Sequence, residues 1–449
     1  MKKPAMLVVL ALLILFSLFA CTGPTTPSSS PMDSGDSFSP DEGALPRVTL
    51  NFWSHDTEYT THPPVYYDRV SNPHTINTVV VPLSEYQIAL NVVLMSNDDN
   101  CPDIIQTEVS FYQRYLSSDM IAPLSDVGIS LDDLEAAGIY AYLIENSVYE
   151  GELKALPAES VAGTWIYRRS VAKEYLDVDT PEQMAELIKD WNTVLDTARK
   201  LKEASGGKAV MFPGFQDWQH AMMARNPEPY IRDGIPVFSQ EIYDFWEFSY
   251  TVFNEKLIPT NRLLMTPSWY EAIRGESDVQ ILGTFGAPWV LSYQIGEMLG
   301  GPGKTTYGDW AITLPPTPFY MGGSYMMIPA NSKKKMEAAE FLRWYCLDTS
   351  ENGFMQYMVD INGLPASGVV NERNVDGFSN PVCDGQNTLA VLMEASSMNY
   401  VNRQQTVYDI WCTDYFSWPA WWFSEDVPWT VEEAAEEVRA YVIERLAGE

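Results

Sequence analysis

From about position 46 onward, short runs of apolar residues alternate with stretches in which apolar residues recur at helical spacing. Short apolar runs at 48–53 and 102–105 predict strands, because they are too short for helices and rich in β-branched or aromatic residues. Helical spacing follows each run, at 82–95 and at 109–117. The helix over 82–95 should bury one face, formed by Tyr86, Leu90, Val93 and Leu94. Strands that alternate with helices in this way indicate an α/β body.

Two helices in the middle of the chain have clear end signals. Thr180 and Pro181 are typical of a helix start, with a capping hydroxyl before a proline at the first helical position. A further helix carries its apolar residues at 194–201 and should end at Gly206 and Gly207, because glycine readily adopts the left-handed conformation that terminates helices.

Two helices near the C-terminal end are the clearest. An apolar stripe predicts a helix over 333–347, which includes Cys346. Thr430 and Glu433 have the spacing of a capping box, which predicts that a helix over 430–446 begins there.

The first 21 residues predict a signal peptide. Lys2 and Lys3 precede a mostly apolar run over 5–20, which ends in small residues before Cys21. A transmembrane helix is the alternative, but this run of about 16 residues is shorter than the roughly 20 that a span needs. A cysteine at the cleavage point resembles the lipobox of bacterial lipoproteins, although Phe19 is larger than the usual residue. The resemblance implies that Cys21 is lipidated.

The segment that follows should connect a membrane anchor to a folded body. Residues 22–46 are almost all Thr, Ser, Pro, Gly, Asp and Glu, so they cannot bury enough apolar surface to offset their chain entropy. We expect a disordered tether there. The remaining body of about 400 residues is too long for one simple core, which favours two lobes.

The charge of the chain excludes one class of partner. Its formal net charge is −32 at pH 7, and such a field repels phosphate backbones. We therefore expect no nucleic-acid partner.

Cysteine and histidine allow two further expectations. Cys101, Cys346, Cys383 and Cys412 remain after Cys21, and an even number outside the cytoplasm permits disulfides. A Cys383–Cys412 pair is the favoured one because both lie in a loop-rich part of the chain, whereas Cys346 belongs to a helical pattern and would simply be buried. The histidines show no ligand spacing, so we expect no metal or other cofactor. A zinc site built from His55, His62 and His74 is the alternative.

Five stretches, taken in order, resemble the extracellular solute-binding proteins of family 1, the maltose and multiple-sugar type that serves ABC importers. The similarity spans roughly 47–446. Arg168 and Arg169 depart from it, as does an insertion near 184–189, which should lengthen one loop. The stretches are Pro-Asp-Ile-Ile at 102–105 with 121–124, 150–157 with 164–167, 190–192 with 199–201, Gly-Thr-Phe-Gly-Ala-Pro-Trp at 283–289, and 322–342 followed by Asn-Gly-Leu-Pro at 362–365.

This resemblance implies a type II periplasmic-binding-protein fold, with two α/β lobes joined by crossing hinge segments and a ligand cleft between them. The N-lobe would be 46–157 and 323–370, and the C-lobe 158–322 and 371–449. By the same resemblance, the protein would be a monomer that works with the permease subunits of an ABC importer, outside the cytoplasm and anchored by its N-terminal lipid. It would bind its ligand by hinge closure.

A sugar site needs flat aromatic platforms and carboxylate or amide partners. Trp53 and Asp56 lie at the end of the first strand, where α/β proteins gather ligands. Glu108 follows the second strand, and the resemblance implies a stacking role for Trp289. Gly323 would let the backbone approach the ligand.

The segment 411–429 contains five tryptophans, most of which should pack inward. The resemblance implies that one aromatic residue from this region stacks on the ligand, and Trp418 and Trp421 are the candidates.

These observations predict capture of a carbohydrate, most simply an oligosaccharide, for import. A lipid-anchored glycoside hydrolase is one alternative, because aromatic platforms and acidic residues also describe such clefts; it would need a placed pair of carboxylates, which no local motif marks. A receptor for a non-sugar solute is the other.

Overall fold

The computed structural model describes residues 45–448 except 97–100, 402, 404 and 426. The predicted signal peptide, Cys21 and nearly all of the predicted tether lie outside the described residues. Within the described part, no helix is both long enough and apolar enough to cross a membrane.

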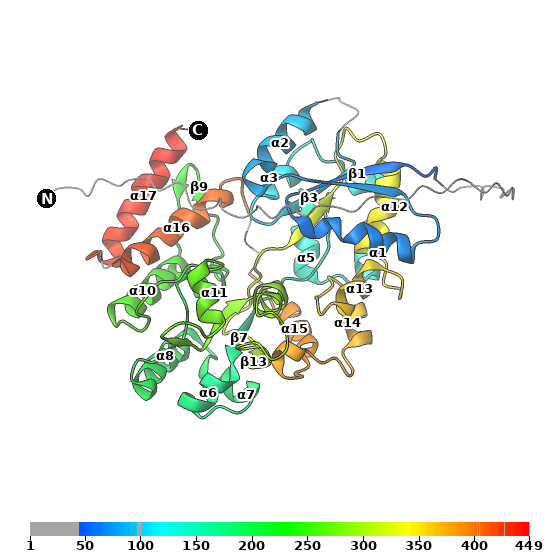
Figure 1. The fold of residues 1–449 in the computed structure, drawn as a ribbon. Coiled ribbons are helices and arrows are strands. Elements are labelled where there is room, and N and C mark those ends of the chain that lie inside the picture. Colours follow the sequence, from blue (N-terminus) through cyan, green and yellow to red (C-terminus); the bar gives the residue numbers. More distant parts are fainter. Residues whose placement is uncertain (1–44, 97–100, 402, 404, 426, 449) are drawn as a thin grey trace, which may run out of the picture. The chain divides into compact units, whose positions relative to one another are not determined.

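A five-stranded sheet of order β2-β1-β3-β14-β6 is built from segments far apart in the sequence. β1 pairs in parallel with β2 and β3, whereas β14 is antiparallel to both β3 and β6. In Figure 1, β14 is the unlabelled yellow strand beside β1 (blue) and β3 (cyan). The strands are β1 (Thr49–Ser54), β2 (Thr75–Val80), β3 (Ile104–Glu108), β6 (Leu156–Pro157) and β14 (Ser324–Met327).

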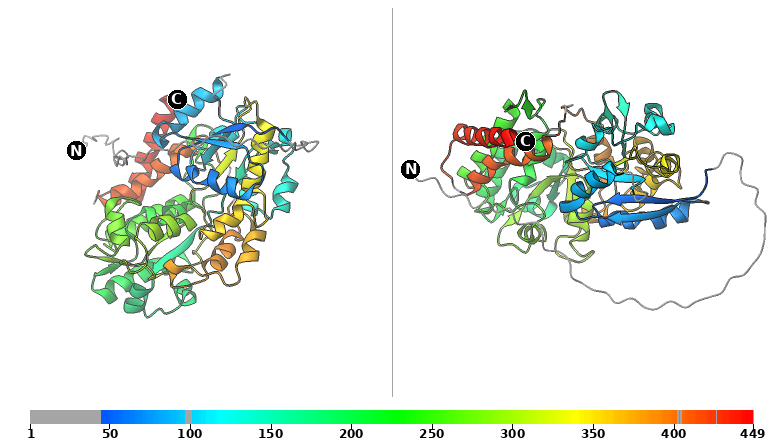
Figure 2. Two further views of the ribbon diagram at one scale, coloured as in Figure 1. Left: turned by 45° about the vertical axis from the view of Figure 1, so that its right-hand side comes forward. Right: turned by 90° about the horizontal axis from the view of Figure 1, so that it is seen from above.

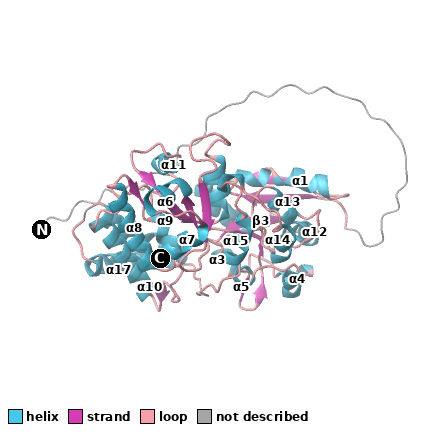
Figure 3. Ribbon diagram, turned by 90° about the horizontal axis from the view of Figure 1, so that it is seen from below, coloured by secondary structure: helices cyan, strands magenta, loops and turns pink. Residues whose placement is uncertain are grey.

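Helices and one small hairpin connect these strands. Figure 3 shows helices surrounding the strands. The connecting elements are η1 (Thr57–Thr60), α1 (His62–Arg69), α2 (Leu83–Met95), α3 (Gln113–Leu116), η2 (Leu124–Val127), α4 (Leu131–Ala136), α5 (Ala141–Asn146), the hairpin of β4 (Val148–Tyr149) and β5 (Glu152–Leu153), α12 (Lys335–Cys346), α13 (Phe354–Asp360) and α14 (Gly368–Asn374).

A second sheet has the order β12-β7-β13, with both neighbours antiparallel to β7. Its strands are β7 (Thr164–Arg168), β12 (Gly283–Gly286) and β13 (Trp310–Thr313), and two short pairs lie apart from it, β8 (Ala209–Val210) with β11 (Gln280–Ile281) and β9 (Ile231–Arg232) with β10 (Ile235–Pro236).

The helices of this part include a long pair at the C-terminal end. α16 packs on both α10 and α17, and Figure 2 shows α16 and α17 side by side. The helices are α6 (Arg169–Leu176), α7 (Pro181–Leu187), α8 (Trp191–Ser205), α9 (Gln216–Met223), α10 (Gln240–Asn254), α11 (Pro267–Ile273), the π-helix η3 (Val290–Glu297), η4 (Pro381–Cys383), α15 (Thr388–Ser396), α16 (Asp409–Ser424) and α17 (Val431–Gly448).

The predicted elements are mostly confirmed, including the α/β class. α2 buries Tyr86, Leu90 and Leu94 as expected. Thr180 caps α7, and α8 ends at Gly206, which has a φ of +60°. The capping box of α17 is formed, with the Thr430 amide donating to Glu433 across 2.9 Å and the Glu433 amide donating to Thr430 across 3.2 Å.

Three details differ from the predictions. The second strand begins at Ile104 and continues to Glu108, and the helix expected over 109–117 is reduced to α3. The reason is that the Val109 amide donates to the Gly323 carbonyl across 3.1 Å, which extends the pairing with β14 past the strand. The insertion near 184–189 is mainly the end of α7 rather than a longer loop.

The expected disulfide is also wrong. Cys101, Cys346, Cys383 and Cys412 are all buried, and these four described cysteines form no disulfide with one another. Cys412 lies inside α16 and Cys383 at the end of η4, so neither belongs to the open loop on which the expectation depended.

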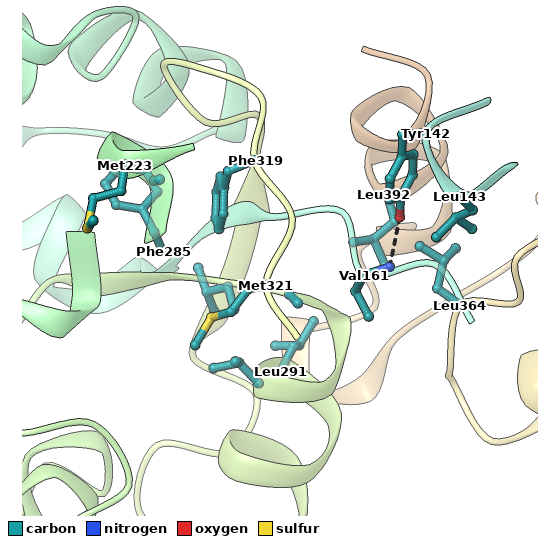
Figure 4. Close-up of a cluster of buried hydrophobic side chains, with 14 of the residues drawn as sticks. Tyr142, Leu143, Val161, Met223, Phe285, Leu291, Phe319, Met321, Leu364 and Leu392 are labelled. Carbon is teal, nitrogen blue, oxygen red and sulfur yellow. Dashed lines mark hydrogen bonds between the residues drawn. The ribbon is translucent and has the colours of Figure 1, made fainter. Parts of the chain in front are cut away.

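The chain passes between the two sheets through closely paired segments. The Gly163 amide donates to the Phe319 carbonyl across 2.8 Å, and the Met321 amide donates to the Val161 carbonyl across 3.1 Å. Figure 4 shows Val161 and Met321 here among buried apolar side chains, with the Val161 amide donating to the Tyr142 hydroxyl. A third segment joins them, because the Ser160 amide donates to the Leu364 carbonyl across 2.9 Å.

Gly163 is required by this packing. A Cβ atom at this position would lie 2.0 Å from the Phe319 ring, which is far closer than atoms can approach.

Candidate ligand-binding site

A cavity of about 970 Å³ is lined by residues near the five-stranded sheet and by residues near the three-stranded sheet. One wall follows β1 and β3, and includes Asp56, Glu58 and Glu108. The facing residues come from the π-helix η3 and the residue before it, including Trp289 and Tyr293. Cavities of this size suit small-molecule ligands, which are usually bound in clefts of about 300–1,000 Å³.

The topology of the first sheet explains why polar groups gather here. The chain leaves β1 for β2 on one side, and β3 then pairs on the other side of β1. The carboxyl ends of β1 and β3 therefore flank a switch point, where open α/β sheets bind ligands. His55 and Asp56 come directly after β1, and Glu108 ends β3.

The polar groups at this end of the sheet support one another. The Gln106 amide donates to Ser324 across 3.1 Å, and the Ser54 hydroxyl donates to Gln106 across 3.1 Å. Asp56 caps η1 by accepting from the Glu58 amide across 2.9 Å. This cap directs the chain so that Glu58 reaches the cavity wall.

Trp289 is held in place by the backbone. Its indole Nε1 donates to the Met321 carbonyl across 2.9 Å, and the ring is partly buried. Gly322 has a φ of +71°, and a Cβ atom there would lie 3.3 Å from the Trp289 Nε1. A glycine at 322 therefore allows the indole to approach the backbone.

Tyr293, one turn further along η3, reaches the opposite wall. Its hydroxyl donates to the Glu58 Oε1 across 2.7 Å. Burial raises the pKa of Tyr293, and the neighbouring Glu58 carboxylate raises it further. The phenol therefore stays protonated and available as a donor at neutral pH.

Three carboxyl groups of the cavity have raised pKa values. Burial raises the pKa of Glu58, against the opposing effect of the Tyr293 hydrogen bond, and burial also raises the pKa of Glu108. The pKa of Glu159 is raised to about 8, first by burial and then by the nearby charges of Glu58 and Asp56.

The histidines do not form the alternative zinc site. His62 hydrogen-bonds through Nδ1 to the Tyr345 hydroxyl at 2.8 Å, whereas His74 contacts Arg47 and His55 contacts Gln106. Among the described residues, no group of three or more His, Cys, Asp or Glu side chains is placed to hold a metal ion.

Four of the predicted site residues line the cavity. They are Asp56, Glu108, Trp289 and Gly323. Gly323 has a φ of +114°, and a Cβ atom there would lie 3.0 Å from a Val161 methyl group, so this glycine also serves the crossing of the chain.

The structure does not bring Trp53, Trp418 and Trp421 into this cavity. Trp53 packs partly buried against the core, on the opposite strand face from buried Phe52 and Ser54. Trp418 packs on Tyr415 and Tyr441 between α16 and α17, and Trp421 is 39% exposed on α16. Their contact with ligand stays a prediction to which the cavity geometry gives no support.

Sequence reasoning missed Glu58, Glu159 and Tyr293. Glu58 and Tyr293 could have been found, since one lies two residues after Asp56 and the other four residues after Trp289, on the same helix face. Nothing local marks Glu159, which is brought to the cavity by the crossing segment that contains it.

A smaller cavity of about 290 Å³ shares Glu108 and Gly322 with the large one. Arg403 lies in it, paired with Asp409 across 2.5 Å and placed over the Tyr230 ring at 4.1 Å. This arginine is already neutralised within its own cavity.

Comparison with known proteins assigns the family. The model of the bacterial extracellular solute-binding proteins matches residues 71–348, which is more than half of the chain. The chain belongs to this family. No curated protein matches the chain.

Solved structures of solute-binding proteins share the fold. A structure described as an extracellular solute-binding protein of family 1 matches with a TM-score of 0.75 and 17% identity, over 89% of this chain and 100% of the other. The sugar-binding protein MalE from Xanthomonas citri matches with a TM-score of 0.67 and 15% identity, over 89% and 98%. An ABC transporter associated binding protein from B. animalis subsp. lactis Bl-04, in complex with beta-1,6-galactobiose, matches with a TM-score of 0.65 and 14% identity, over 89% and 98%. These similarities confirm the periplasmic-binding-protein fold predicted from the sequence.

Proposed function

We propose that this solute-binding protein captures a carbohydrate outside the cytoplasmic membrane and delivers it to the permease of an ABC importer. The lining of the large cavity supports the proposal most directly. It combines aromatic side chains with carboxylate and amide groups, which is the combination that sugar C–H faces and hydroxyls require. The aromatic residues that line it include Trp289, Tyr293, Tyr307 and Tyr357.

Two proteins with this fold support the same ligand class. The B. animalis protein was solved with a disaccharide, and the X. citri protein is described as sugar-binding. A cavity of about 970 Å³ has room for an oligosaccharide of similar length.

Capture by movement of two lobes would follow from the crossing segments. Residues 158–163, 319–323 and 364–367 are joined by backbone hydrogen bonds, so they would act as a common hinge between an N-lobe (46–157 and 323–370) and a C-lobe (158–322 and 371–449). Lipidated Cys21 and the tether over 22–46 would keep a monomeric receptor close to its importer.

A thermal-shift screen against mono- and oligosaccharides tests the ligand class. A bound sugar should stabilise the folded protein by about 2.7 kcal/mol at a hundredfold excess over its dissociation constant. Trp289→Ala should abolish the shift, because the indole lines the cavity. Trp421→Ala, which removes an exposed indole outside the cavity, is the matched control and should keep it.

Two outcomes would contradict the proposal. Stabilisation by no saccharide at all would exclude carbohydrate capture. Release of new reducing ends from a bound oligosaccharide would favour the glycoside hydrolase instead, and mass spectrometry of the recovered ligand detects it.

A further inference from the structure

The large cavity is rich in acidic side chains. Five carboxyl groups line it, and none of its described lining residues is a lysine or an arginine. Burial lowers the pKa of His55, and lowers the pKa of His62 to about 4, so neither histidine supplies a positive charge at neutral pH. The carboxyl groups are those of Asp56, Glu58, Glu108, Glu159 and Glu297.

Buried carboxyl groups elsewhere in the described chain have cations or hydrogen-bond donors beside them. Asp103 accepts from Lys334 across 3.1 Å, and Asp217 accepts from the Trp269 indole across 3.0 Å and from the Gly214 amide across 2.9 Å. Such partners are needed because a carboxylate that leaves water without compensation is strongly destabilising. Glu159 of the cavity differs from both.

Glu58 and Glu159, two of the cavity carboxyl groups, have few hydrogen-bond donors. Glu58 accepts from Tyr293, and Tyr293 is also within the electrostatic reach of Glu159 and Glu297. Within the described residues, no group donates a hydrogen bond to the Glu159 carboxyl oxygens. Glu58 and Asp56 are the charged groups that raise its pKa beside burial, and both are acidic.

We propose that the captured carbohydrate carries a protonated amine, as an amino sugar does, and that Glu58 and Glu159 bind its ammonium group. This inference rests on the proposed carbohydrate function. An ammonium group offers three donors and a full positive charge, so it makes the short, charge-assisted bonds that neutral hydroxyls cannot match. The aromatic lining is compatible, because ring faces attract cations as well as sugar C–H groups.

A metal ion is a poorer counter-charge for this cavity. The described carboxyl groups and histidines nowhere converge as a set of three or more that could coordinate an ion. Separated carboxylates instead suit an organic cation, whose donors extend over several ångströms.

Matched sugar pairs that differ only in charge test the proposal. Calorimetric titration of the full chain would compare glucosamine disaccharide with its N-acetylated and hydroxyl counterparts, diacetylchitobiose and cellobiose. Kanamycin and galactosamine, with neutral galactose as a reference, extend the series to other linkages. We expect at least tenfold tighter binding of the amine-bearing members, and a preference that weakens as salt is added.

Glutamine variants, which replace a carboxyl group by a neutral amide, show which residues cause the preference for amine-bearing sugars. Glu159→Gln and Glu58→Gln should each reduce affinity for the amine-bearing sugars by tenfold or more, with less than a twofold change for neutral sugars. Glu247→Gln, on the exposed face of α10, makes the same charge change outside the cavity and should leave both affinities unchanged.

The outcomes separate this inference from the proposed function. Equal or tighter binding of neutral members would overturn the amine assignment and leave carbohydrate capture intact. Failure of every sugar would overturn both. Spermidine binding as tightly as the amino sugars, or calcium alone stabilising the protein, would overturn the amino-sugar assignment in favour of a simple cation.

Discussion

The Tyr293 hydroxyl donates to the Glu58 carboxylate across 2.7 Å, although the two residues are 235 positions apart in the chain. Glu58 follows the first strand of one sheet, and Tyr293 lies on the π-helix after β12 of the other. This bond joins the two walls of the cavity, and its donor, the phenol hydroxyl of Tyr293, carries no charge. It places a hydrogen-bond donor next to a carboxylate that the ligand itself can also bind.

Tyr293→Phe should weaken ligand binding by about tenfold, since a hydrogen bond to a charged group contributes about 1.5–3 kcal/mol. The variant keeps the ring and removes only the hydroxyl. Isothermal titration with the best sugar from the screen measures the loss. Tyr250→Phe, on α10 and outside the cavity, should bind normally; equal losses in both variants would contradict a local role for the bond.

Glu159 should make the ligand-free protein less stable as the pH rises. Its pKa is about 8 in the folded state and 4.5 for an unperturbed glutamate, so the folded state holds the extra proton between these values. Stability from this group is therefore complete below about pH 4.5 and is lost as the pH rises toward 8. The charges that face Glu159 and cause this shift, beside burial, are those of Glu58 and Asp56.

Glu159→Gln removes that titration. Its melting temperature should exceed that of the wild type by a few degrees at pH 8 and by little at pH 5, in thermal unfolding without ligand. Glu247→Gln serves as the control. A constant difference across the pH range would show that the effect does not come from the titration of Glu159.

Gly163→Ala should destabilise the protein by more than about 2 kcal/mol, because overpacking a tight site typically costs 1–3 kcal/mol and here the added methyl meets an aromatic ring at 2.0 Å. Urea unfolding measures the change. Phe319→Leu in the same chain should recover part of the loss by making room. Gly448→Ala, where nothing lies within 4 Å, should be nearly neutral, and a similar loss there would point to a general glycine effect instead.

Reducing agent should not change the melting temperature of the described body. Cys101, Cys346, Cys383 and Cys412 are buried and form no disulfide with one another, so the described residues contain no cross-link among these four whose removal would relax the unfolded chain. Parallel melts with and without dithiothreitol measure this. A drop of several degrees on reduction would contradict the structure and revive the Cys383–Cys412 pair.

The sequence by itself determined the class of the fold and several of its parts. Local patterns are sufficient for elements such as α2, α8 and α17, because helical spacing and capping residues act within a few positions of the chain. Asp56, Glu108 and Trp289 could be predicted because each follows a recognisable strand or motif, and strand ends are where this class of fold gathers ligand groups.

Tertiary structure alone decided the rest. Glu159 reaches the cavity through a crossing segment, and Tyr293 meets Glu58 only when two distant parts of the chain come together. The same is true of Trp421, whose indole would suit a ligand platform: packing of α16 on α10 and α17 leaves it outside the cavity. The acidic lining of the cavity likewise depends on which side chains converge. The sequence contains 60 acidic residues and does not reveal which five of them line one cavity, where no described lining residue is a lysine or an arginine.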